Sequence, residues 1–286
     1  MAQVKTEAVE LIPGELYRLG AMMPLDGRIS WVPSDLRGYQ PANCYLVLDG
    51  INATLIDTGP AAYEREFVDQ LKSVLPAGAH LTVFVSRLEP EGLGNIGPIQ
   101  AAIGIDHIIT GGIPNMFDSW NEIPGFVELW NNRADWLGDR TFMDRVATGE
   151  SIPMGGSNRL LVLPAPLRIL ATFWVYDKVT RCLFTTDVFG HTAVTSPEES
   201  PVRSSPAEDD TTYESARAHV LAKFPWIPNA QLDSVDEKLS AIFVERQVDI
   251  VAPMHGCILR GEELINKHRQ ILHRILTENK EVPADG

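Results

Sequence analysis

A continuous apolar run, LTVFV at residues 81–85, constrains the fold of this chain more than any other segment. A strand that is apolar at every position is buried on both faces, which is typical of parallel sheets covered by helices. β-prone and helical segments alternate around this run, in the order NCYLVLDG, ATLIDTG, AAYEREFVDQLKSVL, LTVFV, NIGPIQAAIG and DHIIT. We therefore predict parallel strand pairing with helices on the outside.

A second β-rich part follows residue 150, and helices dominate the end of the chain. The expected strands are NRLLVLPAP, ILATFWVYD, TRCLFTTDVFG and VDIVAP. The expected helices are TTYESARAHVLAKF, LDSVDEKLSAIFVERQ and GEELINKHRQILHRIL. Residues 195–211 are rich in proline, serine and acids, which predicts a mobile, solvated loop. Because no internal repeat is visible, we predict a single domain over residues 1–286.

Composition and charge exclude several classes of protein. Of the 286 residues, 44% are hydrophobic, which is enough for a large core. The 24 basic and 38 acidic residues give a net charge of −14, so we expect neither nucleic-acid nor membrane binding. No apolar stretch reaches the roughly 18 residues of a membrane helix, and the N-terminus does not resemble a signal peptide. The three cysteines are widely spaced, which predicts a reducing, cytoplasmic location.

Residues 113–142 are rich in aromatic side chains, including Trp120, Trp130 and Trp136. One interpretation is a flap of short helices that packs on the core. The other is a lid over a pocket that binds an aromatic or apolar small molecule. The sequence leaves both interpretations open.

The glycine pattern GLGNIG at residues 92–97 matches GxGxxG, which is found in dinucleotide-binding proteins. In those proteins the first glycine directly follows a strand, so that the pyrophosphate reaches the N-terminus of the next helix. Here RLEPE intervenes and places two carboxylates where the phosphates would lie. No acid closes the next strand, because Asp106 opens it instead. We therefore do not expect a dinucleotide site.

Acids and a histidine follow three of the predicted strands. Glu89 and Glu91 come just after the LTVFV run, Asp187 ends CLFTTD, and His255 ends VDIVAPMH. Functional residues often lie at strand ends on a rigid scaffold, so we expect these side chains to converge on one site. The alternative for the two glutamates is that they only cap the helix that follows.

These contexts resemble the metallo-β-lactamase superfamily, and in detail its flavodiiron and oxygen-binding diiron branch. That branch carries motifs like SHLEPDHSGN, a histidine before the next hairpin, LFSxDAFG and APxHG. The matching segments here are SRLEPEGLGN, APLRIL, LFTTDVFG and APMHG, and the resemblance runs from about residue 40 to residue 275. It implies an α/β (α+β) fold, the αββα four-layer sandwich, in which helices flank two mixed β-sheets.

The resemblance also implies that the diiron ligand set is incomplete. The positions of one iron's ligands correspond to Arg87, Glu89, Arg168 and Asp187, and those of the other to Glu91, Gly92, Asp187 and His255. Two ligand histidines are therefore arginines and a third is a glycine. An arginine has no lone pair for a metal and keeps its charge at any working pH. The implied metal site is degenerate.

Carboxylates that once faced a metal need another source of positive charge. We expect Arg87 and Arg168 to supply it, in a salt-bridge cluster with Glu89 and Asp187, because the guanidinium fork suits carboxylate pairing. The alternative is that both arginines point to solvent.

A single metal ion would still find ligands in Glu91, Asp187 and His255, with His191 as a conceivable fourth. The nearby arginines oppose such a site by charge repulsion. We therefore expect no cofactor, with one iron or zinc ion as the alternative.

Three functions remain open. The first is a non-metallated pseudoenzyme that works beside a related metal-bearing subunit in a hetero-oligomeric enzyme, with a homo-oligomer as the simpler assembly. The second is a hydrolase with a mononuclear or metal-free site for an aromatic or apolar small molecule. The third is an oxygen or nitric oxide sensor, which needs iron ligands that this chain lacks. No flavodoxin-like module is recognised, and no base is recognised beside Ser86, so no catalytic residue is assigned.

Overall fold

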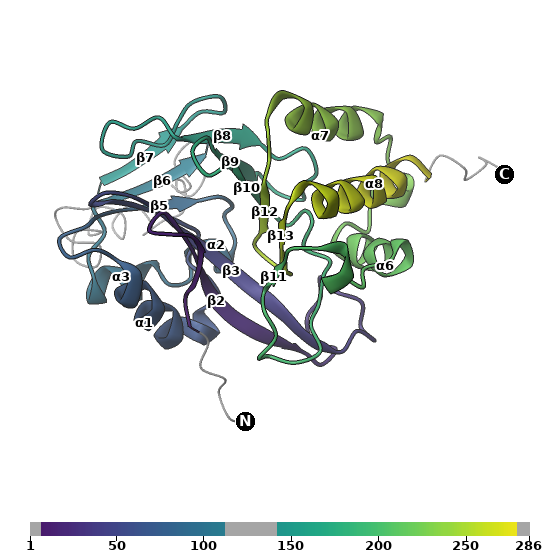
Figure 1. Ribbon diagram of the computed structural model, residues 1–286, viewed down its shortest axis with the longest axis horizontal. Coiled ribbons are helices and arrows are strands. Elements are labelled where there is room, and N and C mark those ends of the chain that lie inside the picture. Colours follow the sequence, from purple (N-terminus) through teal and green to yellow (C-terminus); the bar gives the residue numbers. More distant parts are fainter. Residues whose placement is uncertain (1–6, 112–141, 279–286) are drawn as a thin grey trace, which may run out of the picture. The chain divides into compact units, whose positions relative to one another are not determined.

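The computed structural model describes residues 7–111 and 142–278. Within these residues the strands form two mixed β-sheets, one of seven strands and one of six, and helices flank them (Figure 1). No described helix is long and apolar enough to cross a membrane. The chain divides into two compact units, each made of several segments: unit 1 comprises residues 1–21, 42–164 and 170–180, and unit 2 comprises 22–41, 165–169 and 181–286.

The seven-stranded sheet runs in the order β1-β2-β3-β4-β5-β6-β7. The pair β3–β4 is antiparallel, and β4–β5, β5–β6 and β6–β7 are parallel, as the β-α-β-α-β order predicts. The strands are β1 (Val9–Ile12), β2 (Leu16–Leu25), β3 (Gly38–Asp49), β4 (Asn52–Ile56), β5 (His80–Val85), β6 (His107–Gly111) and β7 (Phe142–Val146).

The helices of unit 1 bury apolar faces that the sequence pattern predicts. Helix α1 (Glu64–Val74) buries Phe67, Val68 and Leu71, and these side chains pack in one cluster with residues of β3, β4 and β5. Strand β5 is buried at every position except His80, as expected for a strand covered on both faces. The other helical segments of this part are η1 (Ala61–Tyr63), α2 (Pro90–Leu93) and α3 (Ile96–Ala102).

Unit 1 also contains the antiparallel hairpin of β8 (Leu160–Pro164) and β9 (Phe173–Asp177). In unit 2, β10 (Cys182–Thr186) pairs in parallel with β12 (Ile250–Pro253), which pairs antiparallel with β13 (Ile258–Arg260). Helix α8 (Glu262–Glu278) packs against both α6 (Tyr213–Lys223) and α7 (Asp233–Glu245), as Figure 1 shows in green and yellow. The 3-10 helix η4 (Ile227–Asn229) lies between α6 and α7 in the chain.

Two segments that the sequence analysis singled out have different outcomes. The acidic segment 195–211 contains strand β11 (Val202–Arg203), which pairs in parallel with β13, and the 3-10 helix η3 (Pro206–Glu208). It is therefore not structureless, and its mobility stays a prediction. The aromatic segment 113–142, with Trp120, Trp130 and Trp136, lies outside the described residues except for its last residue, which begins β7.

A buried ion pair lies at one end of the β8–β9 hairpin, and its arginine also bonds to strand β3. Arg159 donates to both carboxylate oxygens of Asp177, at 2.9 Å and 2.6 Å, and the two side chains are 5% and 0% exposed. The same guanidinium donates to the carbonyl of Leu48 at 3.0 Å. Asp177 also accepts from the hydroxyl of Thr180 and the backbone N–H of Val179. Both charges are thus paired and hydrogen-bonded, which is the condition for burying them.

We predict that Asp177→Asn destabilises the protein by about 3–5 kcal/mol, because it removes the buried carboxylate of Arg159 and leaves only that of the more exposed Glu15, 3.2 Å away. Chemical denaturation measures this as a shift of the midpoint at constant slope. The control is Asp249→Asn, which breaks the exposed Arg181–Asp249 pair at 46% and 40% exposure. That change should cost less than about 1 kcal/mol. Equal losses for the two variants would contradict a structural role for the buried pair.

Candidate functional site

Arg87 lies just after β5 in unit 1 and its side chain is fully buried. Its Nη1 is 3.1 Å from Oε2 of Glu89, and its Nη2 is 2.6 Å from Oε2 of Glu91. The two glutamate side chains are 25% and 12% exposed. One guanidinium therefore pairs with two of the three carboxylates that the resemblance places among the metal ligands. Arginine suits this role because its five donors are held in a rigid fork.

The local backbone explains why these three side chains meet. Pro90 occupies the first turn of α2, where a missing N–H costs nothing, and Glu89 before it is extended at φ −124°. Glu91 follows Arg87 by four positions, and the turn brings its carboxylate back to the guanidinium. Neighbouring Ser86 donates its hydroxyl and its backbone N–H to Asp57, at 2.5 Å and 2.8 Å. The Ser86 hydroxyl is thus hydrogen-bonded to Asp57, which directly follows β4.

Gly92 occupies a position where the resemblance has a ligand histidine. A Cβ atom at Gly92 would lie 2.4 Å from the backbone oxygen of Arg87 and 3.3 Å from Oδ1 of Asp57. The first distance is far below any normal contact, so a side chain at this position requires the backbone to shift. The loop geometry therefore leaves no room for a side chain at this position.

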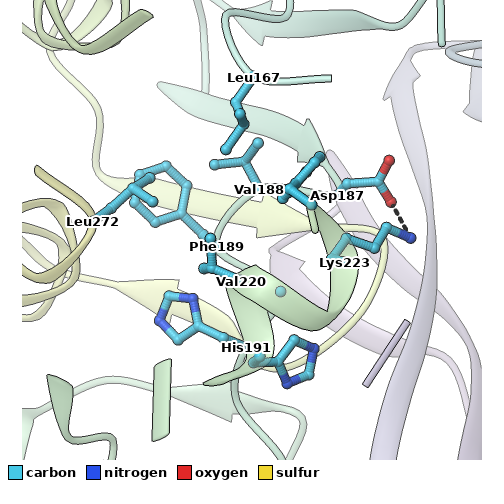
Figure 2. A pocket seen from close by; sticks show the side chains of 11 residues that line it. Leu167, Asp187, Val188, Phe189, His191, Val220, Lys223 and Leu272 are labelled. Atoms are coloured by element: carbon cyan, nitrogen blue, oxygen red, sulfur yellow. Dashed lines mark ion pairs between the residues drawn. The ribbon is translucent and has the colours of Figure 1, made fainter. Parts of the chain in front are cut away.

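Asp187 follows β10 in unit 2 and pairs with a lysine. Nζ of Lys223 is 2.7 Å from Oδ1 of Asp187, and the two side chains are 9% and 4% exposed. Figure 2 shows Lys223 reaching toward this carboxylate. Nδ1 of His255, at the end of β12, is 3.9 Å from the same oxygen. The carboxylate that the resemblance assigns to both irons is therefore engaged by an ammonium group.

Trp31 packs against Lys223 and His255, the two basic residues beside Asp187. Nζ of Lys223 lies 5.0 Å from the centroid of the Trp31 ring, within the range of a cation–π contact. The ring of His255 is tilted by 31° against that of Trp31, with 5.0 Å between centroids. The indole N–H of Trp31 donates to Oε1 of Gln40 at 3.3 Å. Trp31 thus lies against both the ammonium group of Lys223 and the ring of His255.

Sequence reasoning missed Lys223, although the helical spacing around it indicates that this lysine is buried. The buried residues of α6 are Ala216, His219, Val220 and Lys223, at the spacing i, i+3, i+4, i+7 of an apolar helix face. A lysine on that face must find a buried carboxylate, because an unpaired charge there is costly. The pattern therefore indicates a buried ion pair but does not say which acid is the partner.

The other predicted site residues lie elsewhere. Arg168 is exposed, and its Nη1 donates to the carbonyl of Ala165 at 2.6 Å. Among the described residues it pairs with no carboxylate, so the structure does not bring Arg168 and Asp187 together. Nε2 of His191 lies 2.8 Å from Nδ1 of His268 instead of turning to Asp187.

The described residues do not fit a diiron centre of the kind that the resemblance implies. No three His, Cys, Asp or Glu side chains in residues 7–111 and 142–278 form a group that could hold a metal ion. In each of the two units, a basic side chain already pairs with the carboxylates at the expected ligand positions. Arg87 takes the carboxylates of Glu89 and Glu91, and Lys223 takes that of Asp187.

Comparison with solved structures shows the fold. The chain superposes on rubredoxin oxygen:oxidoreductase from Desulfovibrio gigas with a TM-score of 0.66 and 19% identity, covering 96% of this chain and 61% of that one. It also superposes on the flavodiiron protein from Giardia intestinalis with a TM-score of 0.63 and 15% identity, covering 95% and 59%. The fold is thus the αββα sandwich of two mixed sheets that was predicted. The chain spans about three fifths of the length of these two relatives.

A third structure matches over nearly its whole length. It is a fragment, residues 1–254, of a putative diflavin flavoprotein from Nostoc, with a TM-score of 0.65, 16% identity, and coverage of 96% of this chain and 97% of the fragment. A search of curated proteins finds no match.

These relatives correct one expectation. We expected no cofactor, or at most a single iron or zinc ion, whereas the names of the similar structures specify flavin and a di-iron centre. The expectation is therefore wrong for proteins of this fold. The physical reason is that three replaced ligands show only which donors are missing. They do not exclude donors from other parts of the chain, including residues outside the described ranges.

A family comparison places the chain directly. The model of a family described as "ODP family beta lactamase" matches residues 41–256, which is well over half of the chain. The chain therefore belongs to the ODP family of beta-lactamases.

Proposed function

We propose that this chain is a flavodiiron-like subunit that works beside a related metallo-β-lactamase-fold subunit with a complete ligand set, in a hetero-oligomeric enzyme. The observation that supports this proposal most directly is the buried Arg87. It stands where the resemblance has a ligand histidine, and it pairs with two of the ligand carboxylates. The proposal rests on the resemblance and on these ion pairs together.

The charges of the two clusters support a site that has changed its role. Arg87 and Lys223 place one positive charge beside Glu89 and Glu91 and another beside Asp187. A guanidinium cannot act as a ligand, and a divalent ion a few ångströms from it would be repelled by several kcal/mol at an effective dielectric near 20. Side-chain cations therefore stabilise the carboxylates in this subunit. The chemistry of the enzyme would then depend on the partner.

The comparisons support the enzyme class of the assembly. The similar structures are named as a rubredoxin oxygen:oxidoreductase and as flavodiiron proteins, which are redox proteins. The chain covers 61% and 59% of those two proteins, so their whole activity is a proposal here. We propose an oxidoreductase assembly in which the related subunit binds the two irons and this chain maintains the assembly.

We predict that Arg87→Met destabilises the protein by about 3–5 kcal/mol, because Glu89 and Glu91 would both lose the buried guanidinium that pairs with them. The matched control is Arg168→Met, at the second arginine that aligns with a ligand histidine. It is exposed, and within the described residues it bonds only to its own turn, so its loss should cost less than about 1 kcal/mol. Urea denaturation of both variants measures the difference. If both variants keep the stability of the unchanged protein, Arg87 does not hold the acids in place.

We predict that the protein purified from its natural source forms a complex with a second chain of the same fold. Native mass spectrometry gives the stoichiometry, and peptide sequencing identifies the second chain. The second chain should carry histidines at the positions that correspond to Arg87, Gly92 and Arg168. A complex that contains only copies of this chain and still has full oxidoreductase activity would contradict the proposal.

A further inference from the structure

Two residues close to Asp187 have left-handed backbones. Thr186 has φ +51° and Phe189 has φ +67°. This region favours glycine and tolerates asparagine and aspartate, whereas a β-branched or bulky residue there is a genuine outlier. Backbone strain of this kind clusters at functional sites and in switch regions. The turn of residues 186–190 therefore stores strain at the end of β10, where Asp187 lies.

The hydrogen bonds of the turn show why Thr186 is strained. The N–H of Val188 donates to the carbonyl of Thr185 at 3.1 Å, which closes a β-turn. Thr186 is the first central residue of this turn, and a positive φ at that position alone is the pattern of a type II′ turn, which normally has glycine there. The hydroxyl of Thr185 also donates to the carbonyl of Val188, at 2.8 Å. A threonine thus occupies a position that suits glycine.

Two interactions hold the turn from outside. The N–H of Met254, just after β12, donates to the carbonyl of Thr186 at 2.7 Å. Nζ of Lys223, at the end of α6, is 2.7 Å from Oδ1 of Asp187. A charge-assisted bond is about twice as strong as a neutral one, and a strained backbone persists only where its surroundings over-determine it. We therefore expect Lys223 to supply much of the free energy that keeps the turn strained.

Phe189 connects the same turn to helix α7. Figure 2 shows Asp187 turned toward Lys223 and Phe189 turned away from it. The rings of Phe189 and Phe243 meet edge to face, with 5.9 Å between centroids and 82° between planes. Cζ of Arg269, on α8, lies 4.4 Å from the centroid of the Phe243 ring, within the range of a cation–π contact. A change in the backbone of the turn therefore reaches residues of both helices.

We propose that the turn of residues 186–190 is a conformational switch. The Asp187–Lys223 ion pair holds it in the strained state, and loss of the pair relaxes it and moves Phe189 against α7. Each left-handed residue of this kind shifts the equilibrium between the strained and the relaxed turn by roughly 5- to 150-fold. A group that competes for the ammonium of Lys223 is the trigger that such a switch requires, because it binds the relaxed state better.

Three variants separate the release of strain from a general loss of stability. Lys223→Met removes the positive charge and keeps an unbranched side chain. The double variant Lys223→Met with Thr186→Gly also removes the strain at the turn, because glycine adopts a positive φ without steric cost. The control is Lys267→Met, which removes a different ion pair of unit 2, the one with Asp209 at 2.6 Å.

Hydrogen exchange of the full chain measures the outcome at two backbone amides. The amide of Met254 reports the state of the turn, because it donates to the carbonyl of Thr186. The amide of Ile258 reports the rest of the sheet, because it donates to the carbonyl of Pro201 at 2.8 Å. Comparison of the two amides separates local opening of the turn from unfolding of the whole unit.

Lys223→Met should lower the protection of the Met254 amide by at least about 10-fold and that of Ile258 by less than about 2-fold. Adding Thr186→Gly should restore the protection of Met254 to within about 3-fold of the unchanged protein, whereas a glycine at an unstrained position lowers stability. Lys267→Met should leave the Met254 amide within about 2-fold. Equal losses at the two amides, or no restoration by the glycine, would overturn the proposal.

The connection to α7 has a readout of its own. The ring proton resonances of Phe243 should shift in Lys223→Met and return toward their original positions in the double variant, because the ring of Phe189 lies edge-on to that of Phe243. The resonances of Phe67, which packs in the core of unit 1, should not shift. Unchanged Phe243 resonances would also overturn the proposal. Both measurements use this chain alone, so their results do not depend on whether the second subunit of the proposed assembly exists.

Discussion

Buried carboxylates at strand ends are the constraint on which the rest of this protein depends. Glu89, Glu91 and Asp187 are each less than one third exposed, and each needs a positive charge to remain ionised in such a place. Arg87 and Lys223 provide that charge from within the same compact unit as the acid they serve. Within the described residues, these two side-chain cations lie directly beside the three carboxylates.

The two cations act in different ways. Arg87 follows β5 and uses both terminal nitrogens of its guanidinium, which fits two separate carboxylates. Lys223 ends α6 and reaches Asp187 as a single point charge covered by the ring of Trp31. The first arrangement is local in sequence. The second joins a helix to a strand end and depends on correct folding of unit 2.

Much of the fold could be predicted from the sequence, because it follows from local patterns. The apolar run at residues 81–85 and the helical spacing of α1 and α8 predict elements that the structure contains. The Arg87 cluster was also within reach, since its members lie within five positions of one another. The Asp187–Lys223 pair was not, because 36 positions separate its members (223 − 187) and no motif links them. The alignment likewise could not show that Arg168 is exposed, since that depends on how its turn packs.

The ammonium group of Lys223 stabilises the Asp187 carboxylate, and a double-mutant cycle tests this central claim most directly. Asp187→Asn, Lys223→Met and the combined variant are compared with the unchanged protein by denaturant unfolding. Asp187 has other interactions, and the cycle removes their contribution from the pairwise energy. We expect a coupling energy of about 2 kcal/mol or more for this buried pair. A coupling within about 0.5 kcal/mol of zero would contradict the account.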